Sequence, residues 1–547
     1  MAKDLTYGKE AREKVLLGVS KLSKTVEVTM GPMGKNVIIG KFIGAPTITK
    51  DGVSVAREIE LEDPIEELGC QLVKEVAGRT ADIAGDGTTT ATVLAHEIFK
   101  NGNDLINEGY SPIFFRRATE WAVSKMLEEL DKLSSDVNGF NDIRDIATIS
   151  ANNDKYLGQK IAEAFDYVDN IGTVIAEASP GLETTVRTID GIELNSGYIT
   201  HALLSEGKTS ITLNNCRILI VDRNVSQLQD CLKLFNNISE TNTPILIIAR
   251  SLEKEALATI VQNTQLGRLC AAAIEIPTMG TDQNSWLEDL SILLGTKVSS
   301  ESLGTPLSQY SINDLGFAQK VIVGKYTTKI MGGQKDEARL SEKMDLYNED
   351  VKILLGDLER KDIRERIAFL NSKVAVISVG YSTEVELREK GDRIEDALSA
   401  TRAAIEEGIV PGGGAALLHA SKSIDLSDAD EDLIPAINII LSACRRPIMQ
   451  IVKNAGHDPE DIIKRVINSK SSSFGYNAAK NEFCNLVESG IIDPKKVTRT
   501  ALQNAASVSL LLINTEAVIS QAPENPSGWQ PPAGFRVPGD TSLNHKW

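Results

Sequence analysis

The hydrophobic pattern of the chain changes twice, and this change limits what the chain can fold into. Residues 9–30 and 64–84 carry apolar residues at helical spacing, and the region to about residue 132 is mainly helical by this criterion. Between about 190 and 373 the pattern becomes short apolar runs, such as Ile218–Val221, which are typical of strands buried on both faces of a mainly parallel sheet. From about residue 374 the helical pattern returns. The sequence therefore predicts helical ends around a separate α/β unit.

Glycine, proline and apolar runs set the expected bounds of further elements. The cluster Gly31–Gly34 ends the first helix, and a strand is expected at Val37–Ile39. Other strands are expected at Ile245–Ile248, Ala271–Ile274 and Val321–Val323, and helices at 225–238, 394–407, 415–421, 436–453 and 502–520. Residues 521–547 are rich in Pro, Gly and polar residues, so a mobile tail is expected there.

Length and charge narrow the class of protein. The 547 residues exceed the size at which a single hydrophobic core stops growing, so two or more core-bearing units are expected. The net charge of −18 would repel a phosphate backbone, because nucleic-acid binders usually carry a basic face. We therefore expect no nucleic acid among the partners.

The cysteines and the N-terminus bear on the compartment. The six cysteines lie far apart without a CxxC pair, which predicts buried, reduced thiols rather than a zinc site or a disulfide framework. The first residues, Met-Ala-Lys-Asp-Leu-Thr, lack the apolar segment of a secretory signal. No uninterrupted apolar run reaches the roughly 18 residues needed to cross a bilayer. A cytoplasmic protein with no membrane partner is expected.

The segment Gly85-Asp86-Gly87-Thr88-Thr89-Thr90 is the strongest local signal for chemistry. It leads into an amphipathic helix, and glycines before a helix N-terminus let phosphate oxygens approach free backbone N–H groups. Bare phosphates would repel the Asp86 carboxylate, so its presence fits a bound magnesium ion. The alternative is a helix-start turn capped by threonine, and the motif alone does not separate the two.

Two other glycine-rich segments are weaker signals. The loop Thr29–Asn36 lacks the glycine spacing and the final Ser/Thr of a P-loop, and Gly-Pro-x-Gly is by itself more often a plain turn. Three consecutive glycines at Gly412–Gly414 precede an expected helix. Ordering three glycines costs backbone entropy, and a simple connector could avoid this cost by using other residues. Close approach to a ligand is the interpretation for this third segment.

Taken together, these segments resemble the group I (GroEL-type) chaperonin family, as a divergent member, over residues 2 to about 522. The matching stretches are Thr29–Pro32, Gly44–Glu60, Gly85–Thr90, Thr148–Asn152, Glu395–Ala397, Ala400–Ala404, Glu406–Gly408, Gly412–Gly414, Tyr476–Ala479 and Asp493–Pro494. So many ordered motifs make chance agreement negligible.

The resemblance implies a multidomain α+β fold. A mainly helical equatorial ATPase domain would comprise residues 1–132 and 407–522. A small hinge domain, the intermediate domain, would comprise residues 133–189 and 374–406. An α/β apical domain that binds clients and a co-chaperonin would occupy residues 190–373, and a flexible tail would follow at 523–547.

The resemblance also implies an ATP site with Mg²⁺ and K⁺. Asp51 and Asp396 would serve hydrolysis, Asp86 would hold Mg²⁺, and Thr29, Lys50 and Thr89 would surround K⁺. The nucleotide-binding positions would be Thr29, Met30, Gly31, Pro32, Lys50, Asp86, Gly87, Thr88, Thr89, Thr90, Ile149, Ser150, Gly413, Asn477, Ala478, Ala479 and Asp493. For Asp396 alone, a solvated helix carboxylate would be the simpler interpretation.

A client-binding groove is implied in the apical domain. The expected helix 225–238 has apolar residues over about half of its circumference, against about 100° for a core-facing stripe, so part of it is expected to be exposed. Without the resemblance, a wholly buried stripe would be the better interpretation. Gln262 and Ala202 stand where the family carries large apolar groups. The groove positions implied are Tyr198, Leu203, Leu232, Phe235, Leu257 and Val261.

The implied function is ATP-dependent folding of non-native proteins enclosed in a ring cavity. The resemblance implies heptameric rings of identical chains, a GroES-type co-chaperonin, and the cytoplasm of a bacterium or of a virus-infected bacterial host. Met449, Asp104 and Glu108 depart from the family pattern at the inter-ring surface, so we hypothesise that a double ring is weakened or absent. A binding protein without an ATP cycle and a metabolic kinase are the alternatives. The intact Asp51, Asp86 and Asp396 argue against the first, and the second predicts a small-molecule acceptor pocket and no ring.

Overall fold

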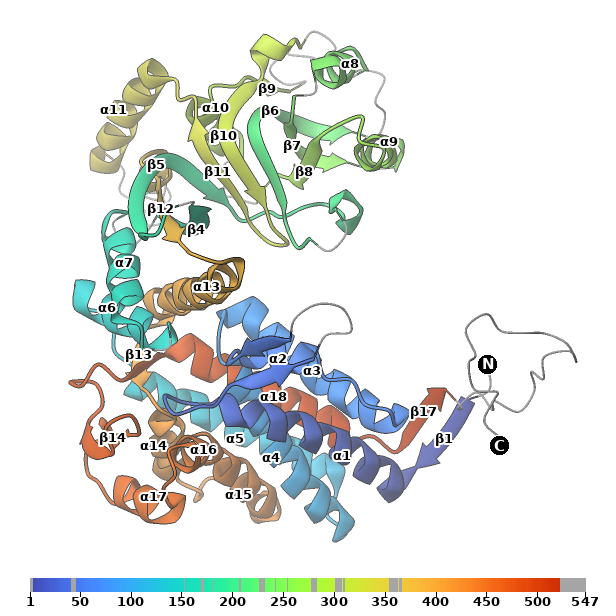
Figure 1. The fold of residues 1–547 in the computed structure, drawn as a ribbon, viewed down its shortest axis with the longest axis vertical. Coiled ribbons are helices and arrows are strands. Elements are labelled where there is room, and N and C mark those ends of the chain that lie inside the picture. The colour runs from blue at the N-terminus through green and yellow to red at the C-terminus, as the bar shows by residue number, and fades with distance from the viewer. Residues whose placement is uncertain are drawn as a thin grey trace, which may run out of the picture. The chain divides into compact units, whose positions relative to one another are not determined.

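The structure is a computed structural model of the chain. The residues it describes are 3–40, 46–151, 153–168, 172–179, 181–205, 208–225, 232–241, 243–252, 254–276, 283–300, 307, 310–353, 363 and 366–521. The chain forms two compact units, which are residues 1–135 with 409–547, and residues 136–408 (Figure 1). The finer division of the second unit into a hinge domain and an apical domain stays a prediction.

The first unit is mainly helical and is built from both ends of the chain. Its N-terminal part contributes α1 (Gly8–Val26), η1 (Glu27–Thr29), α2 (Gly52–Arg57), α3 (Pro64–Ala84), α4 (Thr88–Asn107) and α5 (Pro112–Leu133). Its C-terminal part contributes α14 (Ala415–Ser423), η6 (Glu431–Leu433), α15 (Ile434–Ala443), α16 (Arg446–Asn454), α17 (Pro459–Ile467) and α18 (Lys495–Ile513). The helices predicted in residues 9–30 and 64–84 are confirmed.

Two-stranded antiparallel ribbons complete the described part of the first unit. They are β1 (Lys3–Tyr7) with β17 (Ala517–Gln521), β2 (Val37–Ile39) with β3 (Thr47–Thr49), β13 (Ile409–Pro411) with β16 (Ile492–Pro494), and β14 (Phe474–Asn477) with β15 (Glu482–Asn485). The strand predicted at Val37–Ile39 is confirmed. The predicted mobile tail lies, beyond Gln521, outside the described residues.

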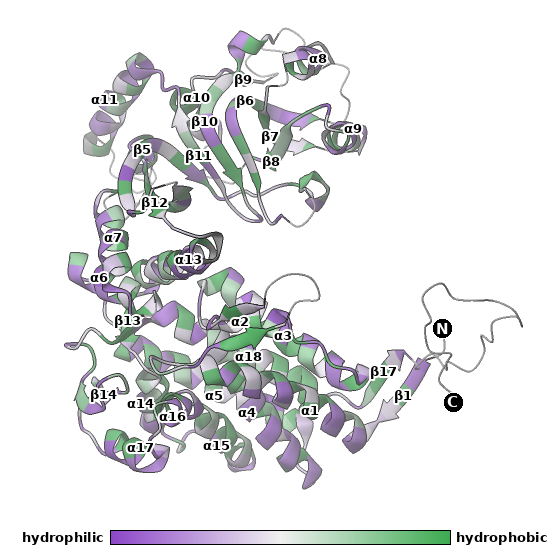
Figure 2. Cartoon of the chain, in the orientation of Figure 1, coloured by the Kyte–Doolittle hydropathy of each residue, from purple (hydrophilic) through white to green (hydrophobic). Residues whose placement is uncertain are grey.

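Helix α18 joins the two ends of the chain into one core. It packs against α3, α4 and α5 of the N-terminal part. Leu502 of α18 is fully buried in the same cluster as Leu94 and Phe99 of α4, and Ser509 Oγ donates a hydrogen bond of 3.1 Å to the Ala95 carbonyl. In Figure 2 the helices of this unit carry both hydrophobic and hydrophilic residues, as amphipathic helices do. The apolar faces therefore come from both ends of the sequence.

Two predicted helices of this unit have different bounds in the structure. The pattern at 436–453 is divided into α15 and α16, because Pro447 lacks the N–H that a continuous helix would need and instead occupies the first turn of α16. The helix predicted at 502–520 begins earlier, directly after Pro494, and ends at Ile513. The apolar residues after it belong to strand β17, in which buried and exposed residues alternate as they do in a strand with one exposed face.

The second unit contains, within the described residues, a nine-stranded sheet in the order β4-β12-β5-β11-β10-β6-β7-β8, with β9 paired to β6. The strands are β4 (Thr173–Ser179), β5 (Thr185–Leu194), β6 (Ile211–Val225), β7 (Ile245–Leu252), β8 (Ala271–Glu275), β9 (Val298–Ser299), β10 (Gly316–Val323), β11 (Thr328–Gly333) and β12 (Lys373–Gly380). The strands predicted from the apolar runs are all present.

The prediction of a mainly parallel sheet is wrong, because the sheet is mixed. Strands β6, β7 and β8 run parallel, whereas β10 pairs antiparallel with both β11 and β6. Only a short turn separates β10 from β11, and such a turn can join antiparallel strands but not parallel ones. Apolar runs report burial and carry no information on strand direction.

Helices surround this sheet. They are α6 (Gly139–Ser150), α7 (Lys155–Asp166), α8 (Leu232–Thr241), α9 (Lys254–Gln265), α10 (Gln283–Leu294), α11 (Glu337–Ile353) and α13 (Glu384–Glu407), with the short η2 (His201–Leu203) and η5 (Ile312–Asp314). Helix α13 starts ten residues before the predicted 394 because the Thr383 side chain caps it by accepting from the Glu386 N–H. The helix predicted at 225–238 begins at Leu232, and Val225 instead ends strand β6.

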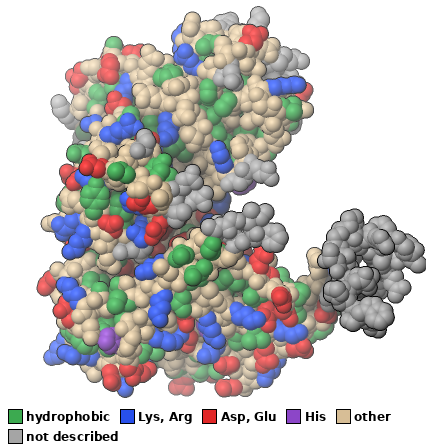
Figure 3. All heavy atoms as spheres, viewed as in Figure 1, with side chains coloured by type: hydrophobic (Ala, Val, Ile, Leu, Met, Phe, Trp, Pro, Cys, Tyr) green, Lys and Arg blue, Asp and Glu red, His purple; other side chains and the backbone are tan. Residues whose placement is uncertain are grey.

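The predicted multidomain α+β fold class is confirmed, with a helical unit and a sheet-containing unit. Cys70, Cys216 and Cys444 are buried free thiols as expected, whereas Cys270 is exposed and Cys484 is partly exposed, so the burial prediction is wrong for these two. Cys231 lies outside the described residues. In the described part of the chain no helix is long and apolar enough to span a bilayer. Figure 3 shows acidic and basic side chains interspersed on the visible face of both units.

The close packing of α1 on α3 yields a stability test. A Cβ on Gly69 of α3 would lie 2.4 Å from the Val15 carbonyl oxygen, whereas a Cβ on Gly78 of the same helix would meet nothing within 4 Å. We expect Gly69→Ala to lower the free energy of unfolding by about 1–3 kcal/mol through overpacking. Gly78→Ala should raise it by about 0.5–1 kcal/mol through helix propensity. Denaturant unfolding measures both, and equal effects of the two substitutions would contradict the packing.

Candidate functional site

The N-terminus of α4 has open backbone donors. Gly85 ends α3 and Gly87 precedes α4, with left-handed φ angles of 73° and 85° that favour glycine. The N-cap of α4 is Gly87, so no side chain caps the helix. Thr88 is buried, and Thr89 and Thr90 are partly buried. The threonine-capped turn, which was the alternative at this motif, is therefore not formed, and the first-turn amides are left for another partner.

Asp86 lies between these two glycines beside a second carboxylate. The Gly87 N–H donates to Asp86 Oδ1, but burial and the nearby charge of Asp51 outweigh this bond and raise the pKa of Asp86 above its usual range. Asp51 caps α2 by accepting from the Val53 and Ser54 amides at 3.1 and 2.8 Å. A Cβ placed on Gly52 would lie only 2.1 Å from Thr89 Oγ1, so the start of α2 packs closely against the start of α4.

A third carboxylate arrives from the far end of the sequence. Asp493 lies on β16 opposite Val410 of β13, and it accepts a backbone hydrogen bond from Gly413. Burial, and then the charge of Asp86, raise the pKa of Asp493 to about 7. Asp86 and Asp493 are therefore close enough to interact, although about 400 residues separate them in sequence. The two ends of the chain meet at this point.

The loop after η1 packs against the C-terminal part of the first unit. Thr29 is buried and donates its hydroxyl to the Val26 carbonyl at 2.9 Å. Met30 is buried in a cluster that also contains Tyr476 and Ala478 of the β14 region. Gly31 and Pro32 are exposed. Through Met30, the loop therefore shares a core cluster with the segment near residue 478, in which nucleotide-binding residues are predicted.

The remaining predicted site residues of this unit are Asn477 and Ala479, at the turn after β14, and Lys50, which precedes Asp51. Asn477 is buried, and its Oδ1 accepts from the backbone N–H groups of Ala479 and Lys480 at 3.1 and 3.2 Å. This side chain fixes the turn between β14 and β15, at which Ala479 is exposed. Lys50 is exposed next to Asp51.

The donor set of the first unit fits a magnesium ion held jointly with phosphates. Among the described residues no group of three or more His, Cys, Asp or Glu side chains could hold a metal ion alone. Mg²⁺ usually takes only one or two protein carboxylates and completes its shell with phosphate oxygens and water. A crowded carboxylate such as Asp86, whose ionised form burial and Asp51 disfavour, is the group that a divalent cation would stabilise.

Three predicted site residues belong to the second unit. Asp396 is partly exposed on α13, and Ile149 and Ser150 are partly buried at the end of α6. Helix α6 packs against α13 within this unit. The structure thus brings these two helices together, and the relation of their residues to the carboxylates of the first unit stays a prediction.

The predicted groove residues gather mainly over one core cluster of the second unit. Phe235, Leu257 and Val261 are partly buried and pack on a cluster that includes Leu219 and Ile247. Leu203 belongs to the same cluster, with only 4% of its surface exposed. Tyr198 packs instead on a different cluster, and its hydroxyl lies 3.2 Å from His201 Nδ1. The side chain of Leu232 lies outside the described residues.

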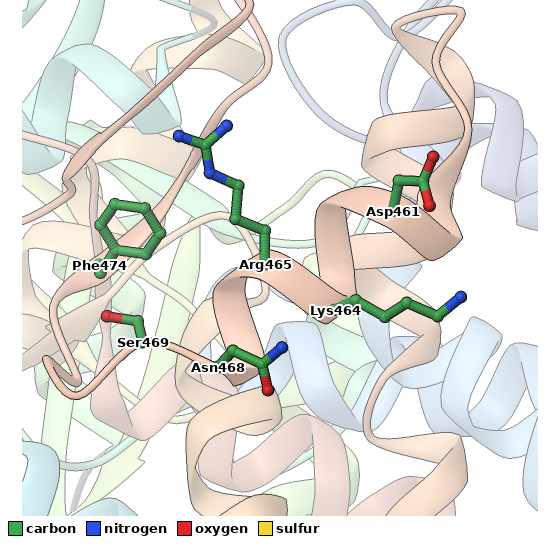
Figure 4. A pocket seen from close by; sticks show the side chains of 6 residues that line it. All are labelled: Asp461, Lys464, Arg465, Asn468, Ser469 and Phe474. Carbon is green, nitrogen blue, oxygen red and sulfur yellow. The ribbon is translucent and has the colours of Figure 1, made fainter.

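A surface depression of about 510 Å³ lies beside α17. Figure 4 shows its lining side chains, which are Asp461, Lys464, Arg465, Asn468, Ser469 and Phe474. None of the predicted site residues lines it. Sequence reasoning missed a different feature, the buried Gln450 and the partly buried Asn454 of α16, whose side chains bond to the backbone of residues 27–30. Their spacing of four in an apolar helix pattern was the available signal.

Comparison with known proteins gives the class of this fold. A sequence model of the TCP-1/cpn60 chaperonin family matches residues 22–523. The chaperonin gp146 from the bacteriophage EL 2 (Pseudomonas aeruginosa), crystallised in presence of ATP-BeFx, is similar in structure with a TM-score of 0.70. The two sequences are 24% identical, and the similarity covers 94% of this chain and 98% of the phage protein. A second crystal form of that protein gives a TM-score of 0.62 at 24% identity and covers 95% and 99% of the two chains. The chain belongs to the TCP-1/cpn60 chaperonin family.

The raised pKa of Asp493 predicts how pH affects stability. The folded carboxyl keeps its proton up to about pH 7, whereas the unfolded one loses it near pH 4. Between these values the folded state binds more protons, so stability falls as the pH rises through this window. We expect Asp493→Asn to reduce the loss of stability between pH 5 and 8, as measured by denaturant unfolding without nucleotide.

Asp425→Asn is the matched control for this experiment. Hydrogen bonds from Ser427 lower the pKa of Asp425, so its contribution is present above the unfolded pKa and is lost only on acidification. This substitution should leave the change between pH 5 and 8 as it is in the wild type. If Asp493→Asn behaves in the same way, the described environment of Asp493 is wrong.

Proposed function

We propose that this chain binds and hydrolyses ATP and uses the cycle to enclose and fold non-native proteins. One observation carries the proposal more than any other. The carboxylates of Asp86 and Asp493, from opposite ends of the sequence, interact beside an α4 N-terminus that no side chain caps. Such a site provides positive helix-dipole ends and backbone N–H groups for phosphates, next to carboxylates that require a cation.

In this proposal each segment of the first unit has its own role in nucleotide binding. The amides of Gly87–Thr90 and the backbone at Thr29–Pro32 would bind phosphates. Gly413, Asn477, Ala478, Ala479 and Asp493 would hold the base and ribose. Asp86 would hold Mg²⁺, and Thr29, Lys50 and Thr89 would surround K⁺. The cations would neutralise the charge that develops during phosphoryl transfer.

Hydrolysis would also require residues of the second unit. Asp51 of the first unit and Asp396 of the second would both serve hydrolysis, with Asp396 orienting or activating the attacking water, and Ile149 and Ser150 would contact the nucleotide. Residues 133–189 and 374–406 would form the hinge domain that delivers Asp396, and residues 190–373 the apical domain. Positioning and charge neutralisation account for most of the rate in phosphoryl transfer, so the delivery of one carboxylate can gate the reaction.

The surface over α8 and α9 would capture clients and a GroES-type co-chaperonin. Phe235, Leu257 and Val261 are only partly buried, so each offers apolar surface that a client could cover. Leu203 is buried in the core cluster and would contribute by supporting the others. Tyr198 and Leu232 complete the proposed set. The cytoplasm is the proposed location.

Two exposed ribbons support assembly into rings of identical chains. In the ribbon β2–β3, Ile38 lies opposite Ile48, and these side chains are 69% and 58% exposed. In the ribbon β1–β17, Leu5 lies opposite Ile519, and these are 50% and 61% exposed. An isolated two-stranded ribbon is only marginally stable in water. Pairing one ribbon with the other ribbon of a neighbouring copy would be a head-to-tail contact, which generates a ring when the rotation between copies closes.

The catalytic proposal is tested by Asp396→Ala. We expect the turnover number for Mg²⁺-dependent ATP hydrolysis to fall about a hundredfold or more, while ATP affinity changes little, since the residue acts on water rather than on nucleotide binding. Steady-state ATPase assays and a binding titration measure the two quantities.

Asp392→Ala is the control, one turn earlier on the same helix and more exposed than Asp396. It should keep the wild-type turnover number. Hydrolysis by the Asp396→Ala protein at the wild-type rate would contradict the assignment of this carboxylate.

The ring proposal is tested by placing charge on the ribbons. Ile38→Asp and Ile519→Asp would each force a carboxylate into the proposed intersubunit contact, and we expect rings to be replaced by monomers in light scattering and electron microscopy. Leu182→Asp, at a position 74% exposed in the second unit, should leave assembly unchanged. Intact rings with both ribbon variants would exclude this contact. The same images count one or two rings per particle in the wild type.

A further inference from the structure

Helix α16 carries three polar residues on one face, Arg446, Gln450 and Asn454, which we call the α16 stripe. Residues spaced by four lie on the same side of a helix. Gln450 is 2% exposed, and Arg446 and Asn454 are partly buried. Burying polar side chains costs free energy unless they find partners, so the partners of this stripe explain why it is there.

The stripe points at residues 27–30, which lead into the loop proposed to bind phosphates. Arg446 Nη2 lies 3.4 Å from Glu27 Oε2. Asn454 Nδ2 donates to two backbone carbonyls, those of Glu27 and Met30, each at 2.9 Å. Gln450 Nε2 donates to Asn454 Oδ1 at 2.9 Å and also lies 3.5 Å from the Glu27 carbonyl oxygen. Both donor hydrogens of the Asn454 amide and its oxygen are therefore in use, which fixes the side chain.

The same helix contacts the glycine-rich segment from the other half of the chain. A Cβ placed on Gly414 would lie 2.7 Å from the Ile448 amide nitrogen, and a Cβ placed on Gly31 would lie 3.0 Å from Ile451 Cγ2. Ile448 and Ile451 lie in one buried cluster with Met30 and Ala478. Helix α16 thus packs against both the Gly31 loop and the Gly412–Gly414 segment, and the polar stripe adds directional bonds to the first of these.

We propose that Asn454 is a positioning residue for nucleotide binding. Its amide holds the carbonyls of Glu27 and Met30, and so sets the direction of the Thr29–Gly31 backbone, while Gln450 holds the amide in its orientation. This inference rests on the proposed function, in which the loop binds ATP. The hydrogen bonds described for the two side chains go to the backbone of residues 27–30 and to each other. Their loss affects how tightly the nucleotide binds rather than how fast bound nucleotide reacts.

The experiment compares ATP binding and hydrolysis, both with Mg²⁺, in the wild type and in Asn454→Asp and Asn454→Ala. Aspartate keeps the shape but has no donor when ionised, and alanine removes the group without adding charge. Since one or two hydrogen bonds to the loop are lost, we expect the Kd for ATP to rise about tenfold in both variants. The turnover number at saturating ATP should stay within about twofold of the wild type.

Asn514→Asp is the matched control. Asn514 Nδ2 also donates to a carbonyl near the C-terminal end of a helix, that of Leu510 at 2.9 Å, in the same unit but on an exposed surface. This variant should bind ATP like the wild type. If it weakens binding as much as Asn454→Asp does, or if turnover and the unfolding midpoint fall together with affinity, Asn454 is merely structural and the inference is overturned.

The outcomes separate this inference from the proposed function. A wild-type chain that binds no ATP overturns the proposed function, and the inference with it. A wild-type chain that binds ATP, with both Asn454 variants binding equally well, overturns the inference alone.

Discussion

The meeting of three carboxylates is the constraint on which the first unit depends. Burial is the main cause that raises the pKa of Asp86 and of Asp493. The charge of Asp51 adds to the first shift and the charge of Asp86 adds to the second, so Asp86 interacts with both of the others. Like charges in a partly buried site cost free energy unless a cation or backbone donors compensate. The packing of α18 on α3, α4 and α5 and the pairing of β13 with β16 hold these groups together. The core therefore supplies the free energy that keeps the carboxylates close.

The arrangement explains why this unit must be built from both ends of the chain. Asp86 and the α4 N-terminus come from the N-terminal part, and Asp493 with Gly413 comes from the C-terminal part. Neither part contains the whole set. Helix α16 helps to hold the two parts together, because its apolar residues pack on both segments and its side-chain amides bind the loop that follows η1. Hydrogen bonds and close packing therefore hold together segments that lie far apart in the sequence.

Much of the fold could be predicted from the sequence, and the failures have physical causes. Proline and glycine indicate the bounds of α3, because these residues act on the backbone locally. The Gly31–Gly34 cluster marks the end of the first helical segment only approximately, since α1 ends at Val26 and the short η1 follows. The apolar pattern at 436–453 runs across Pro447, whose missing N–H causes the break before α16. The pattern at 502–520 does not separate the end of α18 from the strand β17. The sheet is mixed rather than mainly parallel, and apolar runs do not show this because they report burial only. Strand direction depends on the connections and not on hydrophobicity.

The candidate site was predicted unevenly. The motif around Asp86 alone could not be told from a capped turn, and only the geometry of Gly87 as an N-cap without a side chain decides against that alternative. The interaction of Asp86 with Asp493 could not be read from spacing, because it depends on tertiary packing. Asn454 gave a weak signal, its spacing of four from Gln450, which is not distinctive without the carbonyls that it bonds. A polar residue whose role is to donate hydrogen bonds to backbone carbonyls is therefore hard to recognise from the sequence alone.

The most direct test of the central claim is a calorimetric titration of the purified chain with ATP, in the presence and in the absence of Mg²⁺. If the crowded carboxylates and the α4 N-terminus form one site that needs a cation, each chain will bind one ATP with Mg²⁺ and bind it far more weakly without Mg²⁺. Absence of binding in both conditions, or equal affinity with and without Mg²⁺, would contradict the account.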